Sequence, residues 1–247
     1  MDKGRCFIGT SGWYYQHWYG PFYPARLSKE KLLPYFARSF DTVELNNTFY
    51  HLPKETTVKG WYKKAPEDFV FAVKASRFIT HIKRLANLGD SLQLFLKRAY
   101  LLKEKLGPIL YQLPPSMQKE PKRLTIFLKK LPKKRRNVIE FRHRSWLDEE
   151  IFTLLKKFNV AHCVVSMPDF PKVVRATADF VYIRMHGGSS LYRSNYSPAE
   201  LKQCAGWIKK FLKEGLDTYV YFNNDAYGYA VKNAMALKKM LATANYC

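Results

Sequence analysis

Charged side chains occupy alternate positions within short apolar runs of this sequence. Glu44 lies within the run Thr42–Asn47, and Glu140 lies within Val138–Arg142. Because successive side chains of a strand point to opposite faces, each polar set should share one face and the bulky apolar set the other. The same alternation, or a position at the end of a run, singles out further polar residues: Lys74, Gln112, Arg142, Arg184, His186 and Asn223.

These residue types favour acid–base chemistry on an anionic molecule. Glu44 and Glu140 are the candidate acid and base, a pair that suits glycosidic or ester hydrolysis. His186 is a third catalytic candidate, or a hydrogen-bond donor. The three cations, Lys74, Arg142 and Arg184, are expected to bind a phosphate or carboxylate. The alternative is that all these charges pair only with one another in a buried ion network, which is costly to build unless every charge is satisfied.

Two loops are expected beside these polar residues. The segment from Trp13 to Tyr23 contains seven aromatic residues in eleven positions, so Trp13 is predicted to stack on a sugar or a base; alternatively, the segment plugs one end of the fold. The segment from Gly187 to Tyr196 contains Tyr192 and suits a lid, or else an ordinary surface loop. Two amides, Asn46 and Asn224, complete the predicted substrate-binding set.

A metal site is less well supported. The hard donors near predicted strand ends are Glu44, Glu140, Asp169, His186 and Asp225. We therefore expect no metal or other cofactor, with a divalent cation held by the two glutamates as the alternative.

Eight strand-like runs alternate with helical patterns along the 247 residues. The runs are Phe7–Gly12, Thr42–Asn47, Phe69–Ser76, Ile109–Leu113, Val138–Arg142, His162–Ser166, Phe180–His186 and Thr218–Asn223. The helices are expected at 28–40, 56–65, 90–106, 122–131, 147–158, from Ser197 onward and at 229–241, with no helix between 167 and 179. This order predicts an α/β fold, a (β/α)8 TIM-type barrel forming one domain over residues 1–247, rather than a doubly wound open sheet. The polar set would then gather at the carboxyl ends of the strands.

The composition fits a soluble, strongly basic protein. There are 42 Lys and Arg against 20 Asp and Glu, a formal net charge of +22, which favours anionic partners and makes nucleic-acid binding an alternative. No apolar run is long enough to span a membrane and no signal-peptide core is visible, so no membrane association is expected. The four cysteines lack paired spacing, which indicates reduced thiols and a cytoplasmic location.

Several ordered motifs resemble the YecE-like family, also called domain of unknown function 72. They are Ile8–Trp13, Val43–Tyr50, Phe71-x-Val73-Lys74, Gln112–Pro115, Glu140–His143 with Ser145-Trp146, Arg184-x-His186-Gly187 and Tyr221–Asp225. The resemblance runs along essentially the whole chain and implies a (β/α)8 barrel. It implies no particular reaction, because the activity of the family is not settled.

Three functions follow as hypotheses. The first is an enzyme, a hydrolase or lyase, that acts on a phosphorylated or otherwise anionic small molecule or sugar at the carboxyl end of the barrel. The second is a nucleic-acid-binding or processing protein that uses the basic charge and the aromatic loop. The third is a non-catalytic ligand-binding scaffold. The oligomeric state is not predicted.

Overall fold

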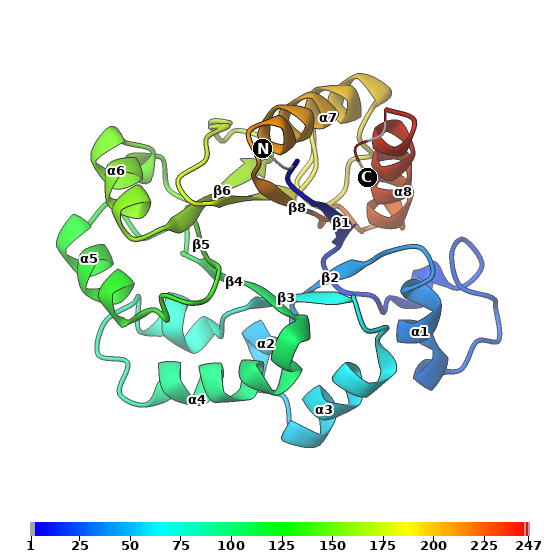
Figure 1. Cartoon of the computed structure of the whole chain (residues 1–247), viewed down its shortest axis with the longest axis horizontal. Helices are drawn as coiled ribbons and strands as arrows, with labels where there is room; N and C mark the ends of the chain where they lie inside the picture. Colours follow the sequence, from blue (N-terminus) through cyan, green and yellow to red (C-terminus); the bar gives the residue numbers. More distant parts are fainter. Residues whose placement is uncertain (1–2, 245, 247) are drawn as a thin grey trace.

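Eight parallel strands form the centre of the molecule in the computed structural model, which describes residues 3–244 and 246. The strands are β1 (Cys6–Thr10), β2 (Thr42–Leu45), β3 (Val70–Lys74), β4 (Leu106–Gln112), β5 (Asn137–Glu140), β6 (Val160–Ser166), β7 (Phe180–Met185) and β8 (Asp217–Phe222). Their order is β1-β8-β7-β6-β5-β4-β3-β2, and a ring of helices surrounds them (Figure 1). The predicted TIM-type barrel is confirmed.

The barrel closes between β1 and β2 near their carboxyl ends. Ser11 forms a parallel bridge with Glu44, and the Gly12 amide donates to the Glu44 carbonyl over 2.8 Å. Lower down, a Cβ atom on Gly9 would lie only 2.2 Å from the Thr42 carbonyl oxygen. Glycine is therefore what lets the first and second strands approach each other at this point.

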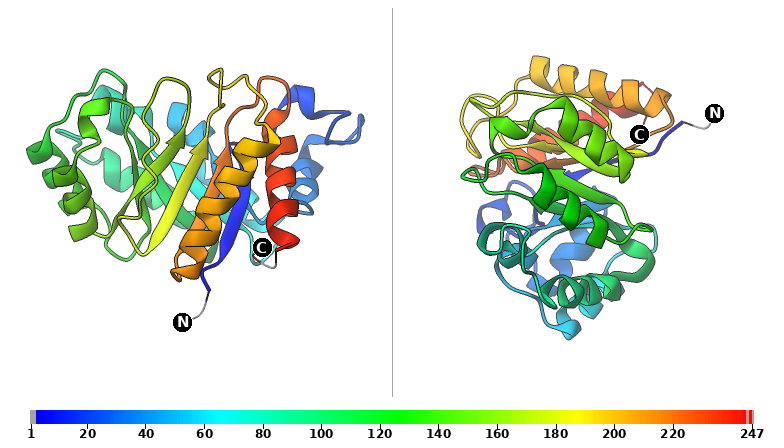
Figure 2. Two further views of the ribbon diagram at one scale, coloured as in Figure 1. Left: turned by 90° about the horizontal axis from the view of Figure 1, so that it is seen from above. Right: turned by 90° about the vertical axis from the view of Figure 1, so that its left-hand side faces the viewer.

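The outer layer consists mainly of seven helices: α1 (Leu32–Phe36), α3 (Glu55–Lys64), α4 (Ser91–Ala99), α5 (Pro121–Lys130), α6 (Glu149–Lys157), α7 (Pro198–Lys213) and α8 (Tyr229–Ala242). Two side views show these helices packed along the outside of the strands (Figure 2). The start of α7 agrees with its sequence signal, since the Ser197 hydroxyl and the Glu200 carboxylate form a reciprocal capping box. As expected, no helix or strand lies between 167 and 179.

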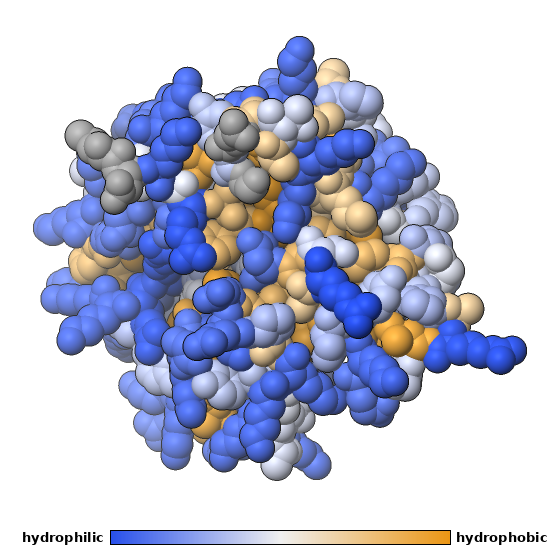
Figure 3. All heavy atoms as spheres, turned by 45° about the vertical axis from the view of Figure 1, so that its right-hand side comes forward, coloured by the Kyte–Doolittle hydropathy of each residue, from blue (hydrophilic) through white to orange (hydrophobic). Residues whose placement is uncertain are grey.

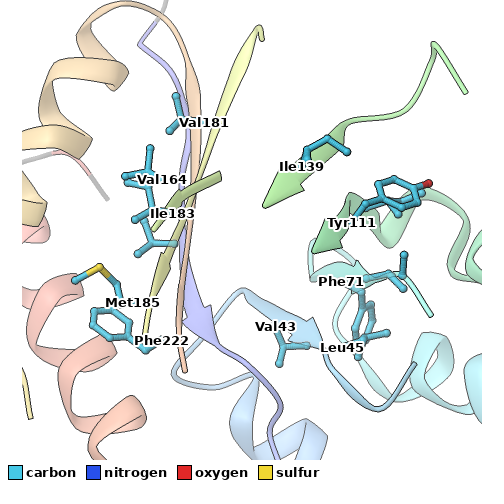
Figure 4. Close-up of a cluster of buried hydrophobic side chains, with 14 of the residues drawn as sticks. Val43, Leu45, Phe71, Tyr111, Ile139, Val164, Val181, Ile183, Met185 and Phe222 are labelled. Atoms are coloured by element: carbon cyan, nitrogen blue, oxygen red, sulfur yellow. The ribbon is translucent and has the colours of Figure 1, made fainter. Parts of the chain in front are cut away.

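Alternation along the strands separates two apolar layers. Outward residues such as Phe71, Ile183 and Phe222 pack in the larger cluster between strands and helices, and Figure 4 shows Met185 and Phe222 directed toward α8. Inward residues form a second cluster inside the barrel. That interior cluster consists of Phe7, Ala72, Leu110, Val138, Ala161, Cys163, Val165, Phe180, Tyr182, Tyr219 and Tyr221. The polar residues that also face inward lie next to this apolar cluster, on the side of the carboxyl ends of the strands.

Some local features differ from the expectations. The predicted helix 90–106 ends at Ala99 and continues as a 3-10 segment, Tyr100–Lys105, with Lys103 at a φ of 51°. A short helix that sequence reasoning missed, α2 (Asn47–Tyr50), follows β2 directly. Four residues carry too little periodicity to be recognised as a helix in a sequence.

The thiols differ in their state. Cys163 and Cys204 are free and buried, whereas Cys6 is disulfide-bonded, so the prediction of reduced thiols throughout is wrong at Cys6. Cys247 lies outside the described residues. None of the helices in the described part of the chain has the length and apolar character needed to cross a membrane.

Candidate functional site

A layer of four charged side chains closes the barrel interior above the apolar cluster. Glu44 from the end of β2 and Glu140 from the end of β5 lie on either side of Arg184, which comes from β7. Arg184 Nη2 donates to Glu44 Oε1 over 2.7 Å, and Arg184 Nη1 donates to Glu140 Oε2 over 2.6 Å. Arg142, just after β5, donates through Nε to Glu140 Oε1. The two carboxylates and two guanidiniums balance each other in charge.

All four carboxylate oxygens have protein donors. Glu44 also accepts from the Ser11 hydroxyl and, over 2.6 Å, from the Tyr182 hydroxyl. Both glutamate side chains have 0% exposure. Burial by itself raises the pKa of Glu140, but the positive charges of Arg142 and Arg184 outweigh it and hold that pKa well below its usual range. Glu140 is therefore a permanently ionised carboxylate rather than a proton donor at neutral pH.

His186 is a neutral member of the same layer. Burial and the neighbouring Arg142 and Arg184 lower its pKa to about 3. Its Nε2 lies 2.9 Å from Arg142 Nη2, and since a guanidinium only donates, Nε2 must accept and the proton sits on Nδ1. Nδ1 lies 3.1 Å from Asn223 Nδ2, so this tautomer requires the Asn223 amide to be turned over, which places its oxygen there as the acceptor. With Nε2 occupied, His186 orients Arg142 and has no lone pair for a substrate proton.

Lys74, the last residue of β3, borders a cavity at the mouth of the barrel. The cavity has a volume of about 610 Å³. Its lining residues are Tyr15, His17, Asn46, Tyr50, Lys74, Leu191, Tyr192, Arg193, Asn223, Asp225 and Ala226. Burial, with help from the positive charge of Arg184, lowers the pKa of Lys74 to about 7, against a raising effect of Glu140 and Glu44. This cavity therefore contains a buried amine that is half neutral near pH 7.

Two more cavities adjoin this mouth. One, of about 440 Å³, lies beneath the aromatic loop between Trp13 and Trp61, whose rings meet edge to face at 5.6 Å. The other, of about 530 Å³, is lined by Arg142 and Leu191, among others. Leu191 also lines the cavity beside Lys74, so the loop that contains Leu191 and Tyr192 stands between the two.

Tyr192 covers the charged layer. Its ring meets the His186 ring edge to face at 5.4 Å, and its hydroxyl accepts from Arg142 Nη2 over 3.4 Å. The residue has a φ of 63°, an uncommon conformation for a bulky side chain. The predicted lid loop thus lies over the predicted site.

The predicted residues fall into three groups. Glu44, Gln112, Glu140, Arg142, Arg184 and His186 form the buried layer, which Gln112 joins by accepting from Arg184 over 3.4 Å. Asn46, Lys74, Tyr192 and Asn223 line the mouth cavity, and Trp13 lines the neighbouring one. Asn224 points elsewhere: it is fully buried and donates to the Ser194 carbonyl and to Asn233 on α8, over 2.9 and 2.8 Å.

A histidine–aspartate pair on the cavity wall was not among the predicted site residues. His17 Nε2 lies 2.9 Å from Asp225 Oδ2, and Asp225 is held by the Trp18 indole NH over 2.9 Å. Burial raises the pKa of Asp225. These residues are 208 positions apart, so nothing in the sequence could pair them, although the aromatic loop and the Asn223–Asp225 motif each pointed to this end of the barrel.

The donor set does not suit a metal ion. Among residues 3–244 and 246, no three His, Cys, Asp or Glu side chains are grouped closely enough to hold one. Asp169 is exposed, and the two glutamates direct their oxygens at arginine, serine and tyrosine donors. The alternative of a cation held by Glu44 and Glu140 has no support in this geometry.

Fold and site together define a TIM barrel with a buried ionic layer beneath a cationic mouth. The chain belongs to the family described as "Protein of unknown function DUF72", whose model matches residues 7–246. The YecE-like resemblance is therefore confirmed.

Relatives and solved structures agree with this assignment. The UPF0759 protein YunF of Bacillus subtilis (strain 168) is 27% identical over 95% of this chain and 94% of its own length. The UPF0759 protein YecE of Escherichia coli (strain K12) is 33% identical, over 56% of this chain and 48% of its own. The crystal structure of a DUF72 family protein from Thermotoga maritima MSB8 has a TM-score of 0.87 and 31% identity, covering 96% of this chain and 99% of that one. A D-psicose 3-epimerase, with a TM-score of 0.58 and 10% identity, shares the fold alone.

Proposed function

We propose that this protein is an enzyme, a hydrolase or lyase, that acts on a small anionic molecule such as a phosphorylated sugar in the mouth cavity. The observation that carries the proposal is Lys74, a buried lysine whose amine opens onto a cavity of about 610 Å³ at the carboxyl end of the barrel. Barrel enzymes build their sites at this end. Arg193 on the lid loop borders the same cavity and supplies a permanent positive charge for the anion.

Other lining residues fit the remainder of such a molecule. The Asn46 Oδ1 atom is buried and has no hydrogen-bond partner among the described residues, which leaves an acceptor for a substrate hydroxyl. Tyr15 and Tyr50 supply ring surfaces of the kind that contact sugars. The cavity size lies within the range of small-molecule sites.

The buried layer supports this site from below. Because Glu44 and Glu140 are saturated by Arg184, Arg142 and hydroxyl donors, we assign them to holding the two guanidiniums rather than to proton transfer. Arg142 retains donor capacity, since the one partner of its Nη1 within the described part of the chain is the Met167 sulfur, at 3.3 Å. The His17–Asp225 pair on the wall is the better acid–base candidate, because an oriented imidazole faces the cavity.

A thermal-shift and calorimetry series tests the proposal. Inorganic phosphate, dihydroxyacetone phosphate and ribose 5-phosphate are each compared with their neutral counterparts or buffer. A ligand at a hundred times its Kd adds about 2.7 kcal/mol, or roughly 5–10 °C for a chain of this size. We expect a thermal shift with at least one phosphorylated compound. The affinity for that compound should fall at least tenfold in Arg193→Gln and stay unchanged in the surface control Arg26→Gln. No shift with any anion, or equal shifts in both variants, would refute this site.

A second candidate function, nucleic-acid binding, is favoured by a basic cavity at the opposite end of the barrel. This cavity of about 400 Å³ is lined by Arg5 and the segment 134–136, among others. The Arg5 guanidinium lies 5.0 Å from the Phe7 ring, which stacks on Tyr219 at 4.6 Å; both rings are buried, so the cations rather than the rings would meet a nucleic acid here.

Oligonucleotide binding tests this second function. Fluorescence anisotropy with single-stranded RNA should show affinity that falls steeply with salt, and Lys134→Gln should reduce the salt slope by about one relative to Lys156→Gln. The other basic residues are distributed along the whole sequence, and hydrophilic side chains cover much of the face in Figure 3. Equal slopes for the two variants would assign RNA binding to this general surface charge instead.

A further inference from the structure

Two buried lysines of this chain differ in what their ammonium groups contact. Lys105 Nζ donates to the backbone carbonyls of Tyr62 and Ala65, each over 2.8 Å, which is how a structural lysine is satisfied. Lys74 is 9% exposed, and its Nζ lies 4.1 Å from the centre of the Phe49 ring. Among the described residues no carboxylate oxygen lies within 4.0 Å of it. Its nitrogen is thus directed at a cavity rather than at a protein acceptor.

The backbone beneath Lys74 is fixed. The Thr48 hydroxyl of α2 donates to the Lys74 carbonyl over 2.6 Å, and Lys74 pairs in register with Leu110 of β4. Phe49 of the same short helix supports the side chain from one side. The amine therefore has a defined position at the floor of the cavity, as a reacting group needs.

The charges around Lys74 keep its amine poised between two forms. Arg184 and Arg142 disfavour the ammonium, Glu140 and Glu44 favour it, and burial adds the largest effect, giving a pKa of about 7. His81, on the π-type turn after β3, is neutral near pH 7 because burial and Lys74 lower its pKa to about 4. A desolvated lysine beside other cations is the setting in which lysines act as nucleophiles.

We propose that Lys74 Nζ is the nucleophile of this site and forms an imine with the carbonyl carbon of an anionic aldehyde or ketone. The neutral amine adds to the carbonyl carbon, the C–N bond forms and the C=O π bond breaks; the nitrogen then releases one proton and the oxygen takes one up, which gives a neutral carbinolamine. The nitrogen lone pair then expels that oxygen as water with a second proton. In total, one neutral amine, one carbonyl and one proton give one iminium and one water.

This inference rests on the proposed function and narrows it. An iminium stabilises the electron pair released when a neighbouring bond breaks, so the chemistry selects a lyase over a hydrolase. Arg193 would hold the anionic group of the substrate while Lys74 meets its carbonyl, and both border the same cavity.

Reductive trapping tests the imine. The full chain is incubated at pH 7.5 with dihydroxyacetone phosphate and sodium cyanoborohydride, and labelled lysines are located by peptide mass spectrometry. At this pH a lysine with a pKa of 7 has several hundred times more neutral amine than an exposed one. We expect Lys74 to be labelled at least tenfold faster than Lys83, a matched lysine over the Phe78 ring. Labelling at position 74 should vanish in Lys74→Arg and persist in Lys83→Arg.

Two controls distinguish a failure of the imine proposal from a failure of the proposed function. Calorimetry with dihydroxyacetone phosphate reports binding independently: binding without preferential labelling of Lys74 overturns the imine and leaves the proposed function standing. Methylation by formaldehyde and cyanoborohydride needs no substrate recognition, and its rate at Lys74 should reach half its maximum near pH 7. If the methylation rates of Lys74 and Lys83 depend on pH in the same way, the inference is overturned, regardless of the calorimetry result. Circular dichroism of Lys74→Arg confirms that the variant is folded.

Discussion

Replacing Lys74 with methionine should change how the stability of this protein depends on pH. The folded amine has a pKa of about 7, whereas the ordinary value is 10.5. Between these two values the unfolded chain binds a proton that the folded chain has released, so the free energy of unfolding rises with pH. Lys74→Met removes this contribution, and its unfolding free energy should therefore rise less between pH 7 and pH 9.

The size of the effect follows from the two pKa values. From pH 7 to pH 9 the unfolded amine stays protonated while the folded amine goes from half protonated to nearly neutral. At 1.36 kcal/mol per pH unit, the wild type should gain about 2 kcal/mol over the variant. The side chain is only 9% exposed, so solvent screening reduces this little.

Urea unfolding at pH 7, 8 and 9 measures the difference. The matched control is Lys105→Met, because Lys105 is equally buried but donates to two carbonyls. The reasoning is refuted if wild type and Lys74→Met gain the same stability across this range. A difference of opposite sign would mean that the folded protein prefers the ammonium, which would also remove the basis for a nucleophilic amine.

Three further changes follow from the geometry. Glu140→Gln should destabilise by about 3–5 kcal/mol in urea unfolding, because it removes the carboxylate of buried Arg142 and one of the two carboxylates that pair with Arg184. Exposed Glu149→Gln should cost less than about 1 kcal/mol, and similar costs for the two variants would contradict the buried pairing. Gly9→Ala should lower Tm sharply, since its Cβ would meet the Thr42 carbonyl at 2.2 Å. Gly60→Ala, in α3 with open space around the new Cβ, should instead stabilise by about 0.5–1 kcal/mol, and a loss of stability there would contradict the packing.

Alternation was enough to predict that the polar residues of the strands face the barrel interior. Glu44, Glu140 and Arg184 converge because a period of two fixes their face and parallel strands bring their carboxyl ends together. Asn224 directly follows Asn223, and only Asn223 lines the mouth cavity; the Asn224 side chain donates to Asn233 on α8 instead.

Sequence patterns could not predict which residues pair with one another across the mouth of the barrel. The His17–Asp225 pair joins a loop after β1 to a loop after β8, and its formation depends on how those loops pack. From the sequence, Lys74, Arg142 and Arg184 received the same predicted role of binding an anion. Only the distances show that Arg142 and Arg184 are paired with carboxylates while Lys74 faces a cavity.

The most direct test of the site is a crystal structure of the full chain with dihydroxyacetone phosphate. We expect the phosphate to lie in the mouth cavity beside Arg193, with the carbonyl carbon within reach of Lys74 Nζ. A phosphate bound only at the opposite end, near Arg5 and Arg135, would contradict the proposed site. A mouth cavity that stays empty at saturating ligand would contradict it as well.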